Sequence, residues 1–580
     1  MQIGSPRSSA GDPSLDNQFI SNMPSASMTG FAERLDSFFR TTERGSDVRT
    51  ELKGGLITFL AMFYILAANP GIISASIGME YYGQLVAATA LSACIACILM
   101  GIYARFPVAL APGMGINAFI SFTIVGAMGF TYEQALAAVF ISGILFMLLT
   151  VTGLRGRIIE SIPPVLKFSI SAGIGFFIIV VALFNAGIIV HGDGSALTMG
   201  DLASPGVLLA IFSIVVTLIL WLRGKWSAVL VGALAAVAVG YAGGQLLGWD
   251  TAVNGVSLIP GVGTAAVGDV MTLPDFGLFG DMFTGLSGFG FGMLPAFAAS
   301  IISLLVVDVF DTTGTLVAVG SQAGMIREDG SIDGGDRAMQ ADAASSLVGA
   351  VAGTTTVTSF IESNVGIAAG ARTGLMAVTV GALFGLALFL TPLLSVITSA
   401  CIAGALVLVG LLMASAVREI DWSRLENSIA AALTVFMTGL SGSITDGIAM
   451  GFLGYILVMW VSGRRSEVSI TVRVLGWVFL GYFLLNYWII PRLRIKGRIE
   501  PHRRTFLPIR NPLISIIRFL SMAAFEQRLD SFFHITERGS TLRTEPQGGD
   551  GLQVVWIAAG IVAVLAIAAA ALLAARSKKA

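Results

Sequence analysis

The chain has 580 residues, of which 55% are hydrophobic and only 12% are charged, and its formal net charge is −1. Soluble domains carry about 25% charged residues, so this composition excludes a soluble protein and indicates an integral membrane protein. The 69 glycines are spread among apolar runs, which suits closely packed transmembrane helices. The three cysteines also lie in apolar segments, and they indicate neither a disulfide framework nor a zinc site.

The start of the chain does not resemble a secretory signal peptide. Residues 1–30 are polar, rich in Ser and Met, and contain no apolar core. We therefore expect a disordered cytoplasmic tail over 1–30. It is followed by an amphipathic juxtamembrane segment over 31–53, which leads directly into the first apolar segment.

Apolar segments of spanning length recur from Gly54 to Gly463. A transmembrane helix needs about 17–25 apolar residues, and on this basis we divide the region into fourteen segments. The third, ninth and tenth are short or broken. The predicted segments are 55–77, 84–104, 108–127, 132–154, 166–189, 205–222, 227–247, 292–318, 339–352, 353–370, 374–394, 397–415, 427–442 and 444–462.

The basic residues support this division independently. If the N-terminus lies inside, every even-numbered connection should be cytoplasmic and rich in Lys and Arg. Every even-numbered connection does contain Lys or Arg, and no odd-numbered one does. The stretch between Lys225 and Arg327 includes the extracytoplasmic loop 251–291 and has neither residue. We therefore expect a multi-pass protein of the cell membrane with a cytoplasmic N-terminus.

Fourteen segments divide into two repeats of seven, over 54–250 and 292–463. Because seven is odd, the second repeat enters the membrane inverted relative to the first, and inverted repeats place substrate between broken helices near the midplane. Pro112, Gly113 and Gly115 interrupt the third segment. The tenth begins with a Thr-rich stretch that favours a strand. We therefore predict an all-α polytopic fold with strand-like breaks in segments three and ten, which face each other across the site.

Carboxylates in the apolar segments mark the candidate site. A charged group at bilayer depth costs about 2.5–3.5 kcal/mol on insertion scales, so it is usually kept for a function. In segment eight, four polar residues share one helical face at spacings i, i+3, i+4 and i+7, and Glu362 follows the break in segment ten. The four are Asp308, Asp311, Thr312 and Thr315.

The residue types suit a flat heterocycle with alternating N–H and C=O groups. The amide of Asn117 offers donors and an acceptor, Asp308 and Glu362 offer acceptors or, when protonated, a donor, and Phe360 could stack on the ring. Asp308, Glu362 and Asp311 could also take a proton from one side and release it on the other. This chemistry requires no metal and no cofactor besides the proton gradient, although carboxylates and Thr hydroxyls leave sodium coupling open.

Each of these residues also has a structural interpretation. Asp311 could cap a helix break or bond to Thr315, and Asn117 could satisfy backbone groups freed near Pro112. A pair between Glu362 and Arg372 is disfavoured because eight helical residues separate the two by about 12 Å.

Two motifs, VVDVFDTTGTLVAVG and GTTTVTSFIESNVGIAAGARTGL, together with ALAPGMGINAFI, are similar to the signatures of AzgA-like purine permeases in the nucleobase–ascorbate transporter superfamily. The resemblance implies that segments one to four and eight to eleven form a core domain and the others a gate domain. It also implies proton-coupled uptake of adenine, guanine or hypoxanthine, and dimer contacts through the gate. The implied substrate residues are Asn117, Asp308 and Glu362, with Asp311, Gly115 and the backbone near Phe360 and Ile361 in support.

The chain continues well beyond segment fourteen. Val472–Ile490 is apolar and precedes a strongly basic stretch. A further span would put this stretch outside, so we expect an interfacial helix and a cytoplasmic basic tail over 464–524. Residues 525–545 nearly duplicate 31–51, and 551–575 are long enough for one extra membrane helix, whose topology stays open.

Several alternatives to a proton-coupled purine symporter stay open. A sodium- or proton-coupled carrier of uracil, xanthine or another small solute would use the same fold, and a channel is a less favoured class. An enzyme is disfavoured because no histidine lies in an apolar segment and no nucleophile–base pattern is present. The expected partners are a purine nucleobase, membrane lipid and a second copy of the chain, with no nucleic acid.

Overall fold

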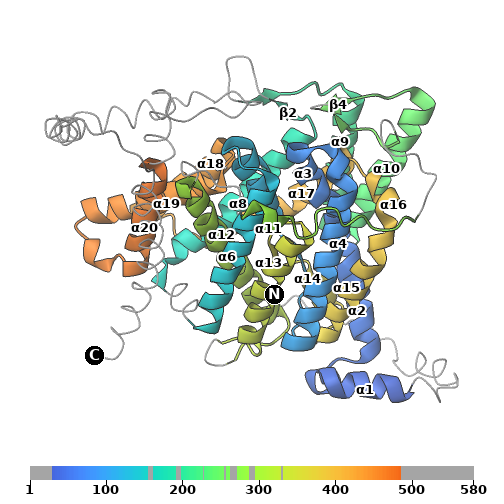
Figure 1. The fold of residues 1–580 in the computed structure, drawn as a ribbon, viewed down its shortest axis with the longest axis horizontal. Coiled ribbons are helices and arrows are strands. Elements are labelled where there is room, and N and C mark those ends of the chain that lie inside the picture. Colours follow the sequence, from blue (N-terminus) through green and yellow to red (C-terminus); the bar gives the residue numbers. More distant parts are fainter. Residues whose placement is uncertain are drawn as a thin grey trace, which may run out of the picture.

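The computed structural model describes residues 29–153, 161–190, 197–225, 227–253, 256–261, 271–286, 294–327 and 331–484. Within these ranges the chain is mostly helical, with three short antiparallel strand pairs. The expected α-helical polytopic fold is therefore confirmed (Figure 1).

Apart from two small hairpins, the described first half of the chain consists of helices and one short strand. In chain order they are α1 Thr29–Phe39, α2 Val48–Met62, α3 Ile65–Ile77, α4 Tyr82–Leu99, β1 Leu110–Pro112, α5 Met114–Ala118, α6 Tyr132–Val151, α8 Pro164–Asn185, α9 Pro205–Leu222 and α10 Ala228–Leu247. Two small hairpins join β2 Ile189–Val190 to β3 Thr198–Met199 and β4 Ala252–Val253 to β5 Val256–Ser257.

The second half repeats this plan after the short α11 Asp281–Gly285. Its elements are α12 Leu294–Gln322, α13 Gly335–Ala352, β6 Val357–Ser359, α14 Ser363–Ala368, α15 Gly374–Ala387, α16 Thr391–Ser395, α17 Ser399–Ala414, α18 Leu425–Ser441, α19 Ile444–Val461 and α20 Ile470–Phe483.

Helix starts follow local sequence signals. Asp47 caps α2 by accepting hydrogen bonds from two backbone N–H groups of its first turn. Thr131 and Gln134 form a capping box at the start of α6. Pro164 and Pro205 occupy the first turns of α8 and α9, where a missing N–H costs nothing.

The strand-like breaks predicted in segments three and ten are both present, and they pair with each other. β1 and β6 run antiparallel, with Leu110 opposite Ser359 and Pro112 opposite Val357. The N–H of Phe360 extends the pairing by donating to the carbonyl oxygen of Ala109 at 2.9 Å. Each break thus satisfies the backbone groups of the other, which is what non-helical backbone inside a membrane protein requires.

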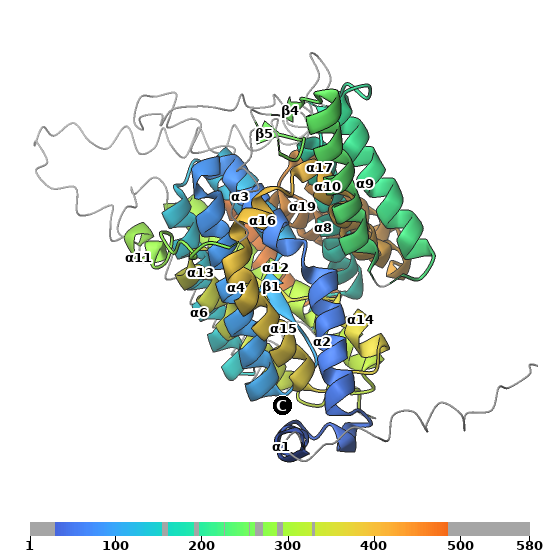
Figure 2. The same cartoon turned by 90° about the vertical axis from the view of Figure 1, so that its right-hand side faces the viewer.

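The helices form two groups, and each group takes helices from both halves of the chain. In the core group, α2 and α4 pack on α15, α4 and α6 pack on α13, and α12 packs on α6. In the gate group, α8 packs on α17 and α18, while α9 packs on α10 and α17. Figure 2 shows the two groups beside each other, with α9 and α10 at the outer edge of the gate group. The expected core and gate arrangement is confirmed.

Ten helical stretches of the described residues are long and apolar enough to cross a membrane. Four of the fourteen predicted segments are not among them. β1 and β6 interrupt segments three and ten, segment thirteen is the 17-residue α18, and segment nine is α13, which carries Asp336, Arg337 and Asp342. The count of fourteen therefore stays a prediction.

The described parts of both ends are helical. α1 lies across the end of the bundle at which α2 begins (Figure 1), and it buries Phe39 while Glu33 and Arg34 are exposed. α20 packs on α19 and α12 and buries Val472 and Phe479. The predictions for the tail over 1–28 and for everything after 484, including the duplicate 525–545 and the extra helix 551–575, lie outside the described residues.

Candidate functional site

The predicted site residues lie on elements that surround the strand pair. α12 and α13 both pack against β6, and α3 and α4 pack against β1. Asn117 is on α5, which continues from β1, and Phe360, Ile361 and Glu362 link β6 to α14. The four polar residues of segment eight are on α12. The structure thus gathers residues about 250 positions apart in the sequence around one pair of strands.

Asp308 lies at the junction of α12, α13 and β6, with only 1% of its surface exposed. Its Oδ2 accepts a hydrogen bond from the Ser346 hydroxyl on α13 at 2.9 Å. The same hydroxyl lies 3.2 Å from the carbonyl oxygen of Val357 in β6. Ser346 therefore ties the predicted carboxylate to the strand.

A second buried carboxylate, Asp342 on α13, was not among the predicted site residues. It is fully buried and accepts hydrogen bonds from Thr312 at 2.6 Å and from Ser359 at 2.7 Å. The Thr312 hydroxyl is also 3.0 Å from that of Thr358. Thr312 is thus a link between α12, α13 and β6. Asp342 lies inside predicted segment nine, so the argument from a charge at bilayer depth also covered it, although its Ala and Ser neighbours are less apolar than those of Asp308.

Asp311 and Thr315 lie further along α12. Asp311 is partly exposed and lies near Thr358, Asp342 and Glu362. Within the described residues it makes no hydrogen bond to Thr315, and α12 continues past it unbroken. The two structural interpretations of Asp311 therefore do not apply.

Asn117 is fully buried on α5. Its Oδ1 accepts a hydrogen bond from the hydroxyl of Thr355, in the stretch that leads into β6. Its Nδ2 has no hydrogen-bond partner among the described residues. The side chain therefore does not serve the freed backbone near Pro112, since the N–H of Gly113 donates to the carbonyl of Thr356 at 3.0 Å.

Glu362 faces the N-terminal span rather than a basic residue. Its Oε1 accepts a hydrogen bond from the Tyr64 hydroxyl at 2.8 Å, where α2 meets α3. Arg372 instead donates to the backbone carbonyls of Ile367 at 2.5 Å and Ala371 at 2.6 Å. The expectation that Glu362 and Arg372 do not pair agrees with these contacts.

The remaining predicted residues have less polar surroundings. Phe360 is buried and has no aromatic partner within the described part of the chain, while Ile361 is partly exposed. Gly115 lies where α5 meets α8 of the gate group. A Cβ added there would be 2.6 Å from Cγ2 of Ile174, so this glycine permits close contact between the two groups.

A buried amide on α3 extends the polar network. Asn69 donates from Nδ2 to the hydroxyls of Thr89 at 2.7 Å and Thr354 at 2.8 Å. Its Oδ1 has no hydrogen-bond partner among the described residues. The sequence analysis did not select Asn69, although an amide directly before Pro70 in an apolar segment was a visible signal.

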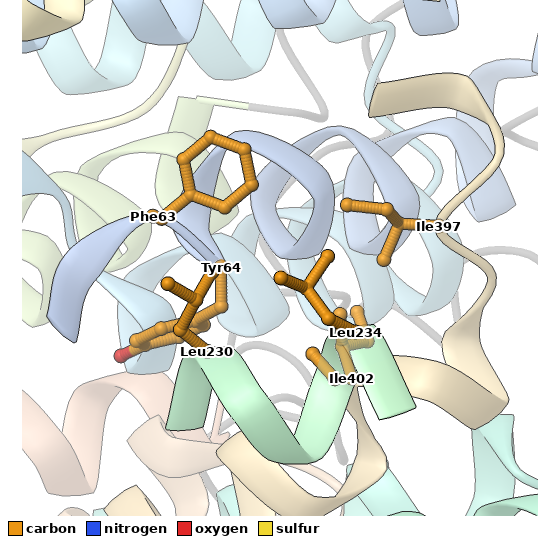
Figure 3. Close-up of a pocket in the computed structure, with 7 residues that line it drawn as sticks. Phe63, Tyr64, Leu230, Leu234, Ile397 and Ile402 are labelled. Atoms are coloured by element: carbon orange, nitrogen blue, oxygen red, sulfur yellow. The ribbon is translucent and has the colours of Figure 1, made fainter. Parts of the chain in front are cut away.

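Tyr64 also lines an apolar cavity between the two helix groups. Figure 3 shows Phe63 and Tyr64, where α2 meets α3, facing Leu230 and Leu234 of α10 and Ile402 of α17. Since the hydroxyl of Tyr64 reaches Glu362, this residue connects the interface between the groups to the candidate site.

The arrangement can bind a small polar molecule inside an apolar bundle. It combines carboxylate acceptors, hydroxyls and two buried amides that each keep one group without a hydrogen-bond partner in the described residues. Buried polar groups normally have partners, because an unmade hydrogen bond costs about 1–3 kcal/mol. The two amide groups are therefore available to a ligand.

Comparison with known proteins places the chain in a family. Residues 49–484 match the model of the Permease family. The guanine/hypoxanthine permease PbuG of Bacillus subtilis is 41% identical over 458 residues, which cover 78% of this chain and 99% of that protein. The adenine permease AdeQ of Escherichia coli is 37% identical over 445 residues, which cover 77% of this chain and 95% of that protein.

Among solved structures, the transmembrane domain of the cyanobacterial bicarbonate transporter BicA aligns with a TM-score of 0.48 and 15% identity, over 70% of this chain and 97% of that one. The family match is much more specific and ends directly after α20. Its members are transporters, not enzymes. The chain therefore belongs to the Permease family, as an AzgA-like member of the nucleobase–ascorbate transporter superfamily.

Proposed function

We propose that the protein imports purine nucleobases, namely hypoxanthine, guanine or adenine, together with protons. The observation that carries this proposal is the partnering of two carboxylates, the buried Asp308 and the partly exposed Glu362. Asp308 and Glu362 each accept a hydrogen bond from a hydroxyl group, Ser346 and Tyr64 respectively. A hydroxyl can donate to a carboxylate or accept from a carboxylic acid. Such a site tolerates both protonation states, which a proton carrier must visit in turn.

The donors and acceptors suit a purine. The free N–H groups of Asn117 would donate to a ring nitrogen or carbonyl, and Asp308 and Glu362 would accept from ring N–H groups. Phe360 would contact the ring face and the backbone near Ile361 its edge. Asp311, Thr312, Thr315 and Gly115 would support the site from its borders. The relatives PbuG and AdeQ carry the names of guanine/hypoxanthine and adenine permeases, which favours a purine over a pyrimidine.

Transport would proceed by alternating access between the core and gate groups. The predicted substrate residues all lie on core elements, and α5 contacts α8 of the gate group through Gly115. Movement of one group past the other would expose the strand pair to each side in turn. We further propose that the N-terminus and α1 lie on the cytoplasmic side, as the distribution of Lys and Arg indicates, and that two copies associate through the gate group.

Uptake into proteoliposomes tests the function. The full chain should accumulate labelled hypoxanthine only with an inward proton gradient, and excess adenine or guanine should compete while sulfate should not. Asp308→Asn keeps the shape but cannot ionise, so it should abolish gradient-driven uptake. Asp250→Asn, at an exposed position after α10, is the matched control and should transport normally.

Other outcomes would change the assignment. Uptake that follows a sodium gradient and ignores the proton gradient would establish the sodium-coupled alternative. Competition by uracil or xanthine alone would replace hypoxanthine, guanine and adenine as the proposed substrates. Passive flux that shows no saturation would support the channel instead.

A further inference from the structure

A second polar pocket lies apart from the strand pair, at the end of the bundle that carries α1. It has a volume of about 420 Å³. Four separate stretches line it: the end of α1 with the turn Thr42–Arg44, the end of the second span near Ala104, the stretch after α12, and the first turn of α13. None of the predicted substrate residues lines this pocket.

Arginine dominates the charge of this pocket. Its lining includes five arginines and two aspartates, an excess of three positive charges. Asp333 is already engaged by two of the arginines, since Arg44 lies 3.0 Å and Arg327 2.5 Å from its carboxylate oxygens. The five arginines are Arg40, Arg44, Arg105, Arg327 and Arg337.

The charges of the remaining arginines are compensated little or not at all within the described residues. The guanidinium of Arg105 stacks 4.5 Å from the ring centre of Phe38, so α1 positions it. Arg40 is paired only with the exposed Glu43, at 3.8 Å. Arg337 is exposed and forms no ion pair within the described residues. Guanidinium groups that converge in this way repel one another unless an anion joins them.

The geometry favours a phosphate group as that anion. Planar guanidinium groups present paired N–H donors that match the oxygens of phosphate. Apolar surface suited to lipid lies close to the pocket in sequence: Ile102 and Tyr103, just before the lining residues Ala104 and Arg105, are exposed. An amphipathic helix beside a basic pocket is a typical arrangement for contact with anionic headgroups.

We propose that this arginine pocket binds a phosphate-type anion, as the headgroup of an anionic lipid or as free phosphate. The bound anion joins α1 and its following turn to the stretch between α12 and α13, and so fixes the N-terminal segment to the core group. The proposal does not depend on which solute is transported.

Native mass spectrometry of the full chain, purified in neutral detergent, tests binding. Phosphatidylglycerol and phosphatidylcholine are added in separate arms, and a calorimetric titration with inorganic phosphate forms a third arm. Arg337→Gln and Arg40→Gln remove exposed charges from the pocket, whereas Arg223→Gln removes an exposed arginine between α9 and α10 and is the matched control. Equal melting temperatures establish that all variants fold.

We expect the wild-type chain to bind phosphatidylglycerol in preference to phosphatidylcholine. Each pocket variant should weaken that binding by about fivefold, as expected for one basic residue near an anionic headgroup, and Arg223→Gln should not change it. Phosphate binding that depends on Arg337 without a preference for the anionic lipid would support the pocket with free phosphate as its ligand. The proposal would be overturned if both pocket variants bound phosphatidylglycerol, phosphatidylcholine and phosphate as well as the Arg223→Gln control does.

Discussion

At the scale of single residues, the buried carboxylates are held by hydroxyl groups. Asp342 accepts from Thr312 and Ser359, and Asp308 accepts from Ser346. These bonds cross from α12 to α13 and from α13 to β6, so they join the three elements that support the site. A carboxylate with two hydroxyl donors in an apolar interior is a structural anchor as well as an acceptor.

We expect Asp342→Ala to destabilise the protein strongly. The substitution leaves the hydroxyls of Thr312 and Ser359 buried without their acceptor, at a cost of about 1–3 kcal/mol each. The melting temperature of the purified protein in detergent measures this loss. Asp250→Ala removes an exposed carboxylate after α10 and should leave the melting temperature almost unchanged. If the Asp342 variant had the same melting temperature as the wild type, these hydrogen bonds would not stabilise the protein.

Sequence reasoning selected the buried carboxylates only in part. Asp308 stood out because long apolar runs flank it, whereas Asp342 lies in a segment with Ala and Ser neighbours that appeared weakly apolar. The partner of Glu362 could not be predicted either. Tyr64 lies 298 positions away from it, and a contact at that separation depends on the tertiary fold. The hydroxyl partners thus became visible only with the fold.

At the scale of elements, the two broken segments were predictable because their breaks have local causes. Pro112 removes a backbone donor and β-branched threonines favour extended backbone. That the two breaks face each other followed from the inverted repeat. Their direct pairing and its register did not, because nothing local sets Leu110 opposite Ser359. Glycines then decide how closely the helices approach, and Gly175 on α8 is an example in the gate group. A Cβ there would meet the backbone of Ala414 and Gly410 on α17.

Gly175→Ala should therefore loosen the gate group. Backbone atoms cannot move aside as a flexible side chain can, and overpacking of this kind typically costs about 1–3 kcal/mol. The midpoint temperature of thermal unfolding should be lower for this variant than for the wild type. The matched control is Gly314→Ala on α12, where an added Cβ meets nothing within 4 Å. This control should be neutral or slightly stabilising because Ala favours a helix over Gly, and equal melts for the two variants would contradict the packing argument.

At the scale of the whole molecule, the core and gate groups each combine helices from both repeats. The division into groups could be expected from the resemblance to a family, and the packing of α8 on α17 and of α4 on α15 agrees with it. What the sequence could not supply is the line along which the groups touch. That line includes the contact of α5 with α8 and the cavity beside Tyr64.

A disulfide across this line tests whether the groups must move. The Cβ position of residue 115 is 3.9 Å from Cβ of Ile174, within the range of about 3.5–4.5 Å that a disulfide requires. The double variant Gly115→Cys, Ile174→Cys should therefore form a bond between α5 and α8 on oxidation. If the core group moves past the gate group in each transport cycle, oxidation should abolish hypoxanthine uptake and a reductant should restore it to the level of the reduced double variant.

Uptake by each single variant should not change on oxidation. Uptake that persists when gel mobility shows a complete cross-link would mean that α5 and α8 stay together throughout transport, and the movement would then have to lie elsewhere in the fold.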